Sequence, residues 1–325
     1  MTPTRSTDRG LVLALSVLFV LLWASGFIAA KLATRTTDVP TVLFWRFVIA
    51  AAVTGAVAAW LRPAMPRGRA LAHLVMTAVL LQVGVFSAVF TGLSRGVPAG
   101  LTSLIVGLAP LLVGLLTPLV LRTPLGVAPV LGLLIGAVGV YVVVSGDLTA
   151  GGPVGPVLLP VLGMAFLTAG TLYQKRFNDD TPVAASVTVQ MVTSMVVLAV
   201  AMPFLDPQWL PTGTGGWLSV LWLGVVNSAG TFAVMFVLLR RRSTVHVSAL
   251  LNLSPATTAL LAVPFLSEAL TGRAVLGLAV ALVGMFVGLG TWPRRRRAPD
   301  RDDGSPVDGS PVDGSPVRAK GLSDR

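Results

Sequence analysis

Arg46 lies inside a long apolar stretch of this sequence, which makes it the most informative candidate for binding chemistry. It follows the start of that stretch, at residue 39, by about two helical turns, or roughly 10 Å of helix. A charge at such a depth in a bilayer is costly unless it faces water, a partner or a bundle interior. Two interpretations stay open: Arg46 anchors a ligand carboxylate, or it donates to helix-end carbonyls or to Asp38.

Three amide side chains, those of Gln82, Asn227 and Asn252, also lie inside apolar stretches. Each could hydrogen-bond a ligand, and each could equally join two neighbouring helices. Asn252 precedes Pro255 by three residues, so the two lie on nearly the same helix face. We predict that the amides face one ligand cavity as a set.

Two prolines and one tryptophan complete the set of candidate cavity residues. Pro110 and Pro255 lie in the middle of apolar stretches. A proline there breaks the backbone hydrogen-bond ladder and could shape a cavity, although membrane helices also tolerate proline with no site nearby. Trp23 lies far from both ends of its stretch, unlike an interfacial tryptophan. It could stack on a ligand, block a cavity or simply pack.

Several kinds of active site lack the residues they need. The chain has no cysteine and only 2 histidines, and it contains no HExxH or GxxxxGK[ST] motif. We therefore expect no enzyme activity, no metal site and no cofactor. No acid lies in the middle of an apolar stretch, so a carboxylate proton relay has no candidate. Glu268 lies at a turn, where we expect a structural role as a helix cap or as the partner of Arg273.

The composition predicts a lipid bilayer as the surroundings of these residues. Hydrophobic residues make up 54% and charged residues 11% of the 325-residue chain, whereas a soluble domain has about 25% charged residues. The formal net charge is +11, but the positive residues lie in short segments between apolar stretches rather than along a binding stripe. That distribution argues against nucleic acid as a partner.

Ten apolar runs are long enough to cross a bilayer, since about 20 residues at ~1.5 Å each span ~30 Å. The first run is too long for the core of a cleaved signal peptide, and further spans follow it. Residues 1–10 are a short polar segment. Residues 293–325, with three DGSPV copies, are expected to be a disordered tail. The predicted spans are 11–33, 39–60, 70–94, 98–121, 124–145, 154–175, 182–204, 215–239, 246–267 and 270–290.

The chain contains two related halves, residues 11–145 and 154–290. Such an internal duplication is typical of membrane transporters. The aligned positions are Pro110 with Pro255, Leu125 with Leu270, Val130–Leu133 with Val275–Leu278, and Val138-Gly139 with Val283-Gly284.

Glycines at the spacing of one helical turn lie in the fifth and tenth spans. This pattern lets helix backbones approach closely. We predict such packing either within the chain or between two chains of a homodimer. The pairs are Gly132 with Gly136 and Gly284 with Gly288.

Most positive residues would face the cytoplasm if the N-terminus did. The positive-inside rule then places both termini in the cytoplasm, which requires an even number of spans. Because each half has five spans, the second half must be inverted relative to the first. The inner positive residues are Arg5, Arg9, Arg62, Arg67, Arg69, Arg122, Lys175, Arg176, Arg240–Arg242 and Arg294–Arg297, and the outer ones are Lys31, Arg35, Arg95 and Arg273.

Four local patterns accompany this architecture. They resemble those of EamA-type permeases of the drug/metabolite transporter superfamily, over roughly residues 11–290. The resemblance implies an all-α integral membrane protein with ten transmembrane helices in two inverted five-helix repeats. The sequence departs from the family at Thr123, which stands where the family often has an acid. The patterns are Trp23-Ala24-Ser25-Gly26-Phe27 with Lys31, Arg46-Phe47, Leu253-Ser254-Pro255, and Glu268 followed by Gly277 and Gly284.

The resemblance and the duplication imply a secondary transporter or exporter of a small organic metabolite, an amino acid or a drug-like compound. Alternating access would expose a site between the halves, near the bilayer midplane, to each side in turn. A non-transporting membrane scaffold or sensor is the alternative. Arginine greatly outnumbers lysine, which is typical of a GC-rich bacterial genome, so we expect a multi-pass protein of the bacterial inner membrane.

Overall fold

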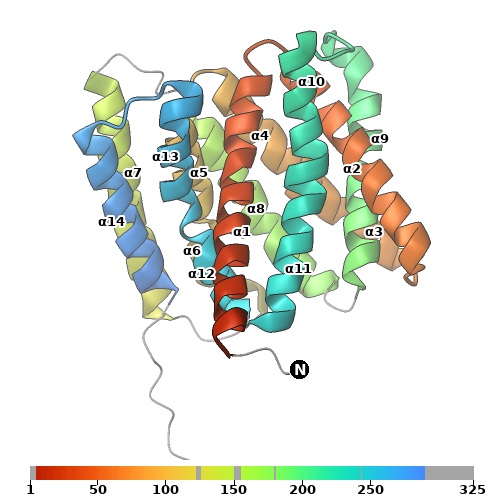
Figure 1. The fold of residues 1–325 in the computed structure, drawn as a ribbon, viewed down its shortest axis with the longest axis horizontal. Helices are drawn as coiled ribbons and strands as arrows, with labels where there is room; N and C mark the ends of the chain where they lie inside the picture. The colour runs from red at the N-terminus through yellow and green to blue at the C-terminus, as the bar shows by residue number, and fades with distance from the viewer. Residues whose placement is uncertain (1–4, 122–125, 150–154, 179–180, 243, 290–325) are drawn as a thin grey trace, which may run out of the picture. The chain divides into compact units, whose positions relative to one another are not determined.

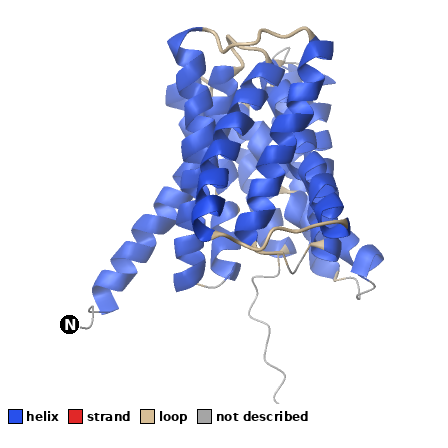
Figure 2. Ribbon diagram, turned by 90° about the vertical axis from the view of Figure 1, so that its right-hand side faces the viewer, coloured by secondary structure: helices blue, strands red, loops and turns tan. Residues whose placement is uncertain are grey.

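A computed structural model describes residues 5–121, 126–149, 155–178, 181–242 and 244–289. Every regular element in these ranges is a helix (Figure 2). The prediction of an all-α protein is thereby confirmed. The predicted tail with its DGSPV copies and the departure at Thr123 lie outside the described residues.

The helices follow one another in the order shown in Figure 1. They are α1 (Arg5–Ala33), α2 (Val39–Leu61), α3 (Arg69–Ala78), η1 (Val79–Gly84), α4 (Val85–Ser94), α5 (Ala99–Gly107), α6 (Ala109–Leu121), α7 (Val127–Thr149), η2 (Gly155–Val157), α8 (Leu158–Phe177), α9 (Val183–Leu205), α10 (Gly213–Leu221), η3 (Trp222–Gly230), α11 (Thr231–Arg241), α12 (Thr244–Leu251), α13 (Ser254–Leu266) and α14 (Gly272–Gly288).

Within the described part of the chain, 9 helical segments are long and apolar enough to cross a membrane. Their limits fall within a few residues of the predicted spans: the run predicted at 215–239, for example, is the segment Gly213–Arg241. The tenth predicted span is α14, a shorter apolar helix of 17 residues.

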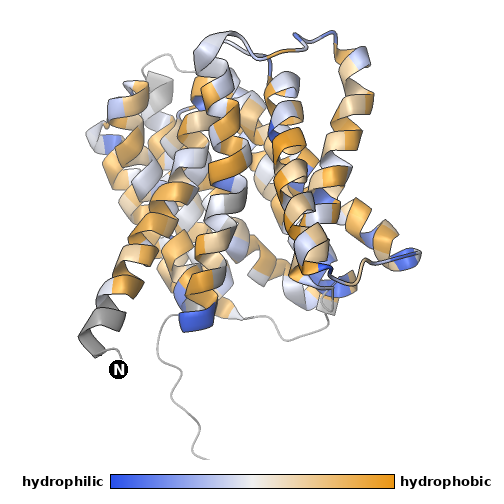
Figure 3. Cartoon of the chain, turned by 45° about the vertical axis from the view of Figure 1, so that its right-hand side comes forward, coloured by the Kyte–Doolittle hydropathy of each residue, from blue (hydrophilic) through white to orange (hydrophobic). Residues whose placement is uncertain are grey.

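Large apolar side chains cover much of the surface of the described helices. Trp60, Leu119 and Phe204 are 81%, 79% and 84% exposed, and hydrophobic residues mark the outer faces of the helices in Figure 3. Exposed apolar area on this scale would be a liability in water. It fits a chain whose solvent is lipid hydrocarbon.

The third and eighth spans each contain a π-helical segment at its middle. In the third span η1 separates α3 from α4, and in the eighth span η3 separates α10 from α11. π-helical turns are rare, and they frequently occur at functional sites. Gln82 lies in η1 and Asn227 in η3, so two of the three predicted amides lie on these irregular turns.

The fourth and ninth spans are broken just before their equivalent prolines. The break between α5 and α6 lies at Leu108, and that between α12 and α13 lies at Asn252 and Leu253. Pro110 and Pro255 follow these breaks, where the missing N–H and the bulk of the ring oppose a continuous helix. The prediction that both prolines interrupt their helices agrees with this geometry.

Helices α7 and α14 lie side by side (Figure 1) and pack through glycines. A Cβ added at Gly277 would lie 2.6 Å from the Gly139 carbonyl oxygen, and one at Gly284 would lie 2.6 Å from the Gly136 nitrogen. No side chain fits at such distances. The glycines of the fifth and tenth spans therefore serve close packing within one chain.

Candidate functional site

Arg46, on α2, is buried among aromatic rings and is only 4% exposed. Its guanidinium carbon lies 3.7 Å from the centre of the Phe86 ring and 5.5 Å from those of Phe47 and Phe90. These cation–π contacts stabilise the charge through the ring faces. Among the described residues, its Nε and Nη1 atoms have no hydrogen-bond partner. The site thus holds a buried cation with two free donors.

Asp38, one of the partners considered for Arg46, has another contact. Its carboxylate accepts a hydrogen bond from the backbone N–H of Gln208 at 3.2 Å. In the described part of the chain, the Arg46 guanidinium is surrounded by the aromatic rings of Phe47, Phe86 and Phe90, not by a carboxylate. An anion that reached this site would find a positive charge without an acid already bound to it.

Gln82 lies about one turn before Phe86 and takes part in a polar network beside the Arg46 cluster. Its amide donates to the side-chain oxygen of Gln190, on α9, at 3.2 Å, and the Gln190 amide lies 3.0 Å from the hydroxyl of Ser186. Gln190 was not among the predicted site residues. One signal could have identified it, because it aligns with Arg46 when the two halves are superimposed in sequence.

Asn227 of η3 binds α1 at Leu22, the residue before Trp23. The Asn227 amide donates to the carbonyl oxygen of Leu22 at 3.0 Å, and it lies over Gly26, where a Cβ would come within 2.5 Å of its nitrogen. The ring of Trp23 is tilted against Phe19 at a centroid distance of 6.1 Å. Asn227 thus joins η3 to α1, and Trp23 packs against a cluster that contains Leu238 of α11 and Val247 of α12. These contacts agree with the packing alternative considered for each residue.

The two prolines differ in their surroundings. Pro255 is buried, and a Cβ added at Gly107 would lie 3.1 Å from its ring, whereas Pro110 is exposed. Asn252, beside the α12–α13 break, is 4% exposed, and its amide nitrogen has no partner among the described residues. The break in the ninth span therefore offers a free buried donor.

Glu268 holds three segments together at the end of the bundle where α1 ends. Its carboxylate lies 2.6 Å from the ammonium nitrogen of Lys31 and accepts from the backbone N–H of Ala99 at 3.0 Å. We expected Arg273 as its partner, but the recorded ion pair joins Glu268 to Lys31. The expected capping role agrees with the contact to Ala99, the first residue of α5.

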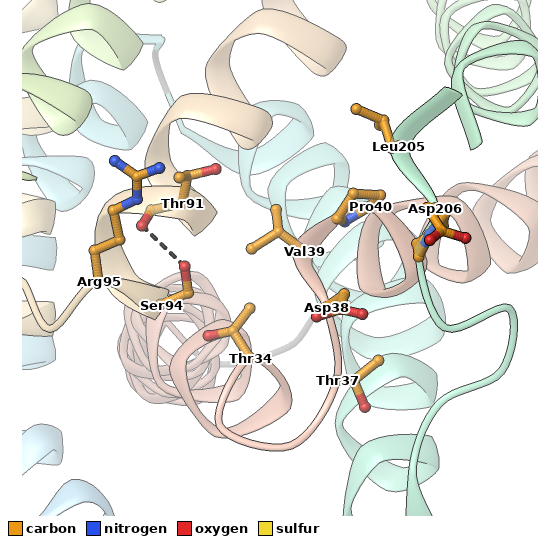
Figure 4. Close-up of a pocket in the computed structure, with 11 residues that line it drawn as sticks. Thr34, Thr37, Asp38, Val39, Pro40, Thr91, Ser94, Arg95, Leu205 and Asp206 are labelled. Carbon is orange, nitrogen blue, oxygen red and sulfur yellow. Dashed lines mark hydrogen bonds between the residues drawn. The ribbon is translucent and has the colours of Figure 1, made fainter. Parts of the chain in front are cut away.

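Cavities in the described part of the chain lie away from the predicted residues. One of about 410 Å³, shown in Figure 4, lies among the ends of α1, α4 and α9 and the start of α2. Two others, of about 390 and 380 Å³, share Arg176 and Phe177 at the end of α8. None of the predicted cavity residues lines any of them. Arg46, Gln190 and Asn252 are buried, with 4%, 5% and 4% of their surfaces exposed.

Comparisons with known proteins agree with a transporter architecture. The chain is 24% identical over 297 residues to a probable amino-acid metabolite efflux pump of Salmonella typhimurium, covering 87% of this chain and 96% of that protein. It is 28% identical over 212 residues to the uncharacterized transporter YwfM of Bacillus subtilis, covering 63% and 68% of the two chains. One solved crystal structure shares the fold with a TM-score of 0.60 at 20% identity, over 86% and 96% of the chains.

The model of the EamA-like transporter family matches this chain twice, over residues 9–145 and 155–289. These two matches cover nearly all of the described helices and fall on the two halves seen in the sequence. The resemblance to EamA-type permeases of the drug/metabolite transporter superfamily is thereby confirmed, and the chain belongs to the EamA-like transporter family.

Proposed function

We propose that this protein is a secondary transporter that moves a small organic metabolite or amino acid across the membrane by alternating access. The observation that carries the proposal is the buried Arg46 guanidinium, which has two free donors and aromatic neighbours in a chain of a transporter family. A buried charge with no structural partner is expected where a substrate supplies the partner.

The chemistry of Arg46 favours a substrate with a carboxylate. A guanidinium forms strong charge-assisted hydrogen bonds with a carboxylate, and Nε and Nη1 both lack a partner among the described residues. Gln82 and Gln190 lie close by and could recognise a second polar group. The name of the Salmonella relative, an amino-acid metabolite efflux pump, supports this substrate class.

Inverted repeats of five helices each are the second part of the proposal. Gly132 aligns with Gly277 in sequence, and Gly139 aligns with Gly284. In the packing of α7 and α14, Gly284 approaches Gly132 just as Gly139 approaches Gly277. Exchanging the halves maps one contact onto the other, as a two-fold axis in the membrane plane requires. This reciprocity supports counting α14 as a tenth span.

Sidedness and location are the third part of the proposal. The excess of arginine and lysine in alternate segments supports cytoplasmic termini, and the excess of arginine over lysine supports a bacterial inner membrane. The glycines that suggested a homodimer pack within the chain, so a dimer stays a prediction without a contact to support it.

Flux into proteoliposomes tests the function. Purified protein is assayed with labelled amino acids, other carboxylates and aromatic cations, with and without an imposed pH gradient. We expect carboxylate flux without a gradient, and we expect Arg46→Ala to abolish it. Arg95→Ala, which removes an exposed arginine, is the matched control and should keep the flux. Absence of flux for every compound would favour the scaffold or sensor alternative.

A further inference from the structure

Lys31, Val97, Ala99 and Glu268 form a polar cluster that we call the strap. The Lys31 ammonium lies 2.6 Å from Glu268 Oε1 and donates to the Val97 carbonyl oxygen at 2.9 Å. Both oxygens of the Glu268 carboxylate lie 3.0 Å from the Ala99 backbone nitrogen. One lysine and one glutamate therefore connect the end of α1, the start of α5 and the turn between α13 and α14.

The strap joins the two halves of the chain at one end of the bundle. Lys31, Val97 and Ala99 belong to the first half and Glu268 to the second. A second link lies beside it, where Arg35 donates to the carbonyl oxygen of Leu266 at 3.0 Å. The Lys31 and Glu268 side chains are only 13% and 20% exposed, so solvent screens their attraction less than that of a surface pair.

Directly below the strap, α5 of the first half packs against α13 of the second. A Cβ added at Gly100 would lie 3.0 Å from the Ala259 Cβ, and one at Gly107 would lie 3.1 Å from the Pro255 ring. The face of α5 that carries Gly100 and Gly107 and the face of α13 that carries Pro255 and Ala259 therefore form the contact between the two halves.

This contact is made by small groups, glycines of α5 against Pro255 and Ala259 of α13, whose van der Waals attractions are individually weak. The strap supplies a charged interaction at the end of the same two helices. Its loss is therefore expected to weaken the closed contact between the halves.

We propose that the strap is the gate of the transport path at the end where α1 ends, and that Lys31 and Glu268 separate when this end opens. The inference rests on the proposed function, because a gate needs a path. Opening would part α5 from α13, and Ala259, which faces Gly100 across this contact, would become accessible to water. Closure would restore the ion pair and the cap on Ala99.

The natural absence of cysteine gives a direct test, since Ala259→Cys introduces the only thiol, on the face of α13 that meets Gly100. Membrane vesicles are treated, from one side at a time, with a maleimide that cannot cross the bilayer. The labelling rate is compared with and without Glu268→Gln, which keeps an acceptor for the Ala99 N–H and removes the charge that binds Lys31. We expect labelling from one side to accelerate about tenfold, the effect of losing one charge-assisted hydrogen bond.

Two further variants serve as controls. Asp206→Asn removes a carboxylate at the same end, at a left-handed position (φ 45) that asparagine tolerates, and should leave the labelling rate unchanged. Lys31→Arg keeps the ion pair and should keep labelling slow.

Unchanged labelling in Glu268→Gln would overturn the gate and leave Glu268 as a helix cap. Equal acceleration from both sides together with a lower melting temperature would also overturn it, because that combination indicates loosened packing. Flux in the same vesicles separates the two proposals. One-sided acceleration in a protein that moves no substrate would retain the strap as a closing device and contradict the transport proposal.

Discussion

At the scale of single residues, Arg46 raises the question of whether a buried charge serves stability or binding. Its contacts with Phe86 and the neighbouring rings contribute on the order of 2 kcal/mol. Removing an ion from water costs several kcal/mol, and no carboxylate or carbonyl is recorded to offset that cost. The balance is therefore unfavourable in the absence of a ligand, which is the pattern expected of a binding residue.

Replacing Arg46 by methionine should consequently stabilise the ligand-free protein. Methionine fills a similar volume and interacts well with aromatic rings. We expect Arg46→Met to raise the free energy of unfolding by about 1–4 kcal/mol while abolishing flux. The melting temperature of the detergent-solubilised protein measures the first effect. A lower melting temperature would identify Arg46 as a structural residue.

The matched substitution Arg95→Met controls for a general effect of methionine. Arg95 is exposed beside the cavity of Figure 4, and a surface change of this kind alters stability by about 0.5 kcal/mol or less. If both variants raised the melting temperature equally, the gain in Arg46→Met could not be attributed to removing a buried charge.

The side-chain contacts between residues on different helices were the part of the site that the sequence predicted least well. The depth of Arg46 and the turn position of Glu268 followed from their places in the apolar runs. The pairing of Glu268 with Lys31, and of Gln82 with Gln190, depends on which helices are neighbours and how they are rotated. Periodicity within one helix contains no such information.

At the scale of helices, the contact between α7 and α14 depends on the absence of side chains. We expect Gly284→Ala to lower the free energy of unfolding by about 1–3 kcal/mol, the usual effect of overpacking. The added Cβ would lie 2.6 Å from the Gly136 nitrogen and would also meet the Gly132 carbonyl oxygen. Both are backbone atoms, which cannot rotate away as a side chain can. Thermal unfolding of the purified variant measures the loss.

Gly55→Ala provides the comparison within α2. A Cβ at Gly55 has nothing within 4 Å, and alanine favours a helix over glycine by about 1 kcal/mol. Its melting temperature should stay the same or rise. A fall as large as that of Gly284→Ala would mean that any added methyl group disturbs these helices.

Helix limits were predictable from sequence, whereas helix irregularities were not. Hydrophobic runs report where a chain can lie in hydrocarbon, so the segment Val39–Leu61 was placed to within a residue. The π-helical segments η1 and η3 add a residue to a turn without changing hydropathy. Proline did reveal the breaks before Pro110 and Pro255, because its ring has a direct steric effect on the helix.

At the scale of the whole molecule, inversion of the halves predicts that equivalent loops face opposite sides of the membrane. The turn after α2 and the turn after α9 are such a pair: each follows a residue in the left-handed conformation, Arg62 with φ 46 and Asp206 with φ 45. Single cysteines at the exposed positions Ala64 and Leu210 place one thiol in each loop.

An impermeant maleimide added to intact cells should label Leu210→Cys and spare Ala64→Cys, because arginine-rich segments stay in the cytoplasm. A permeant maleimide should label both, which controls for accessibility. Labelling of both loops from outside would mean that the halves are parallel. Alternating access through a two-fold axis in the membrane plane would then lose its geometric basis, since exchange of the halves could no longer convert an outward-open state into an inward-open one.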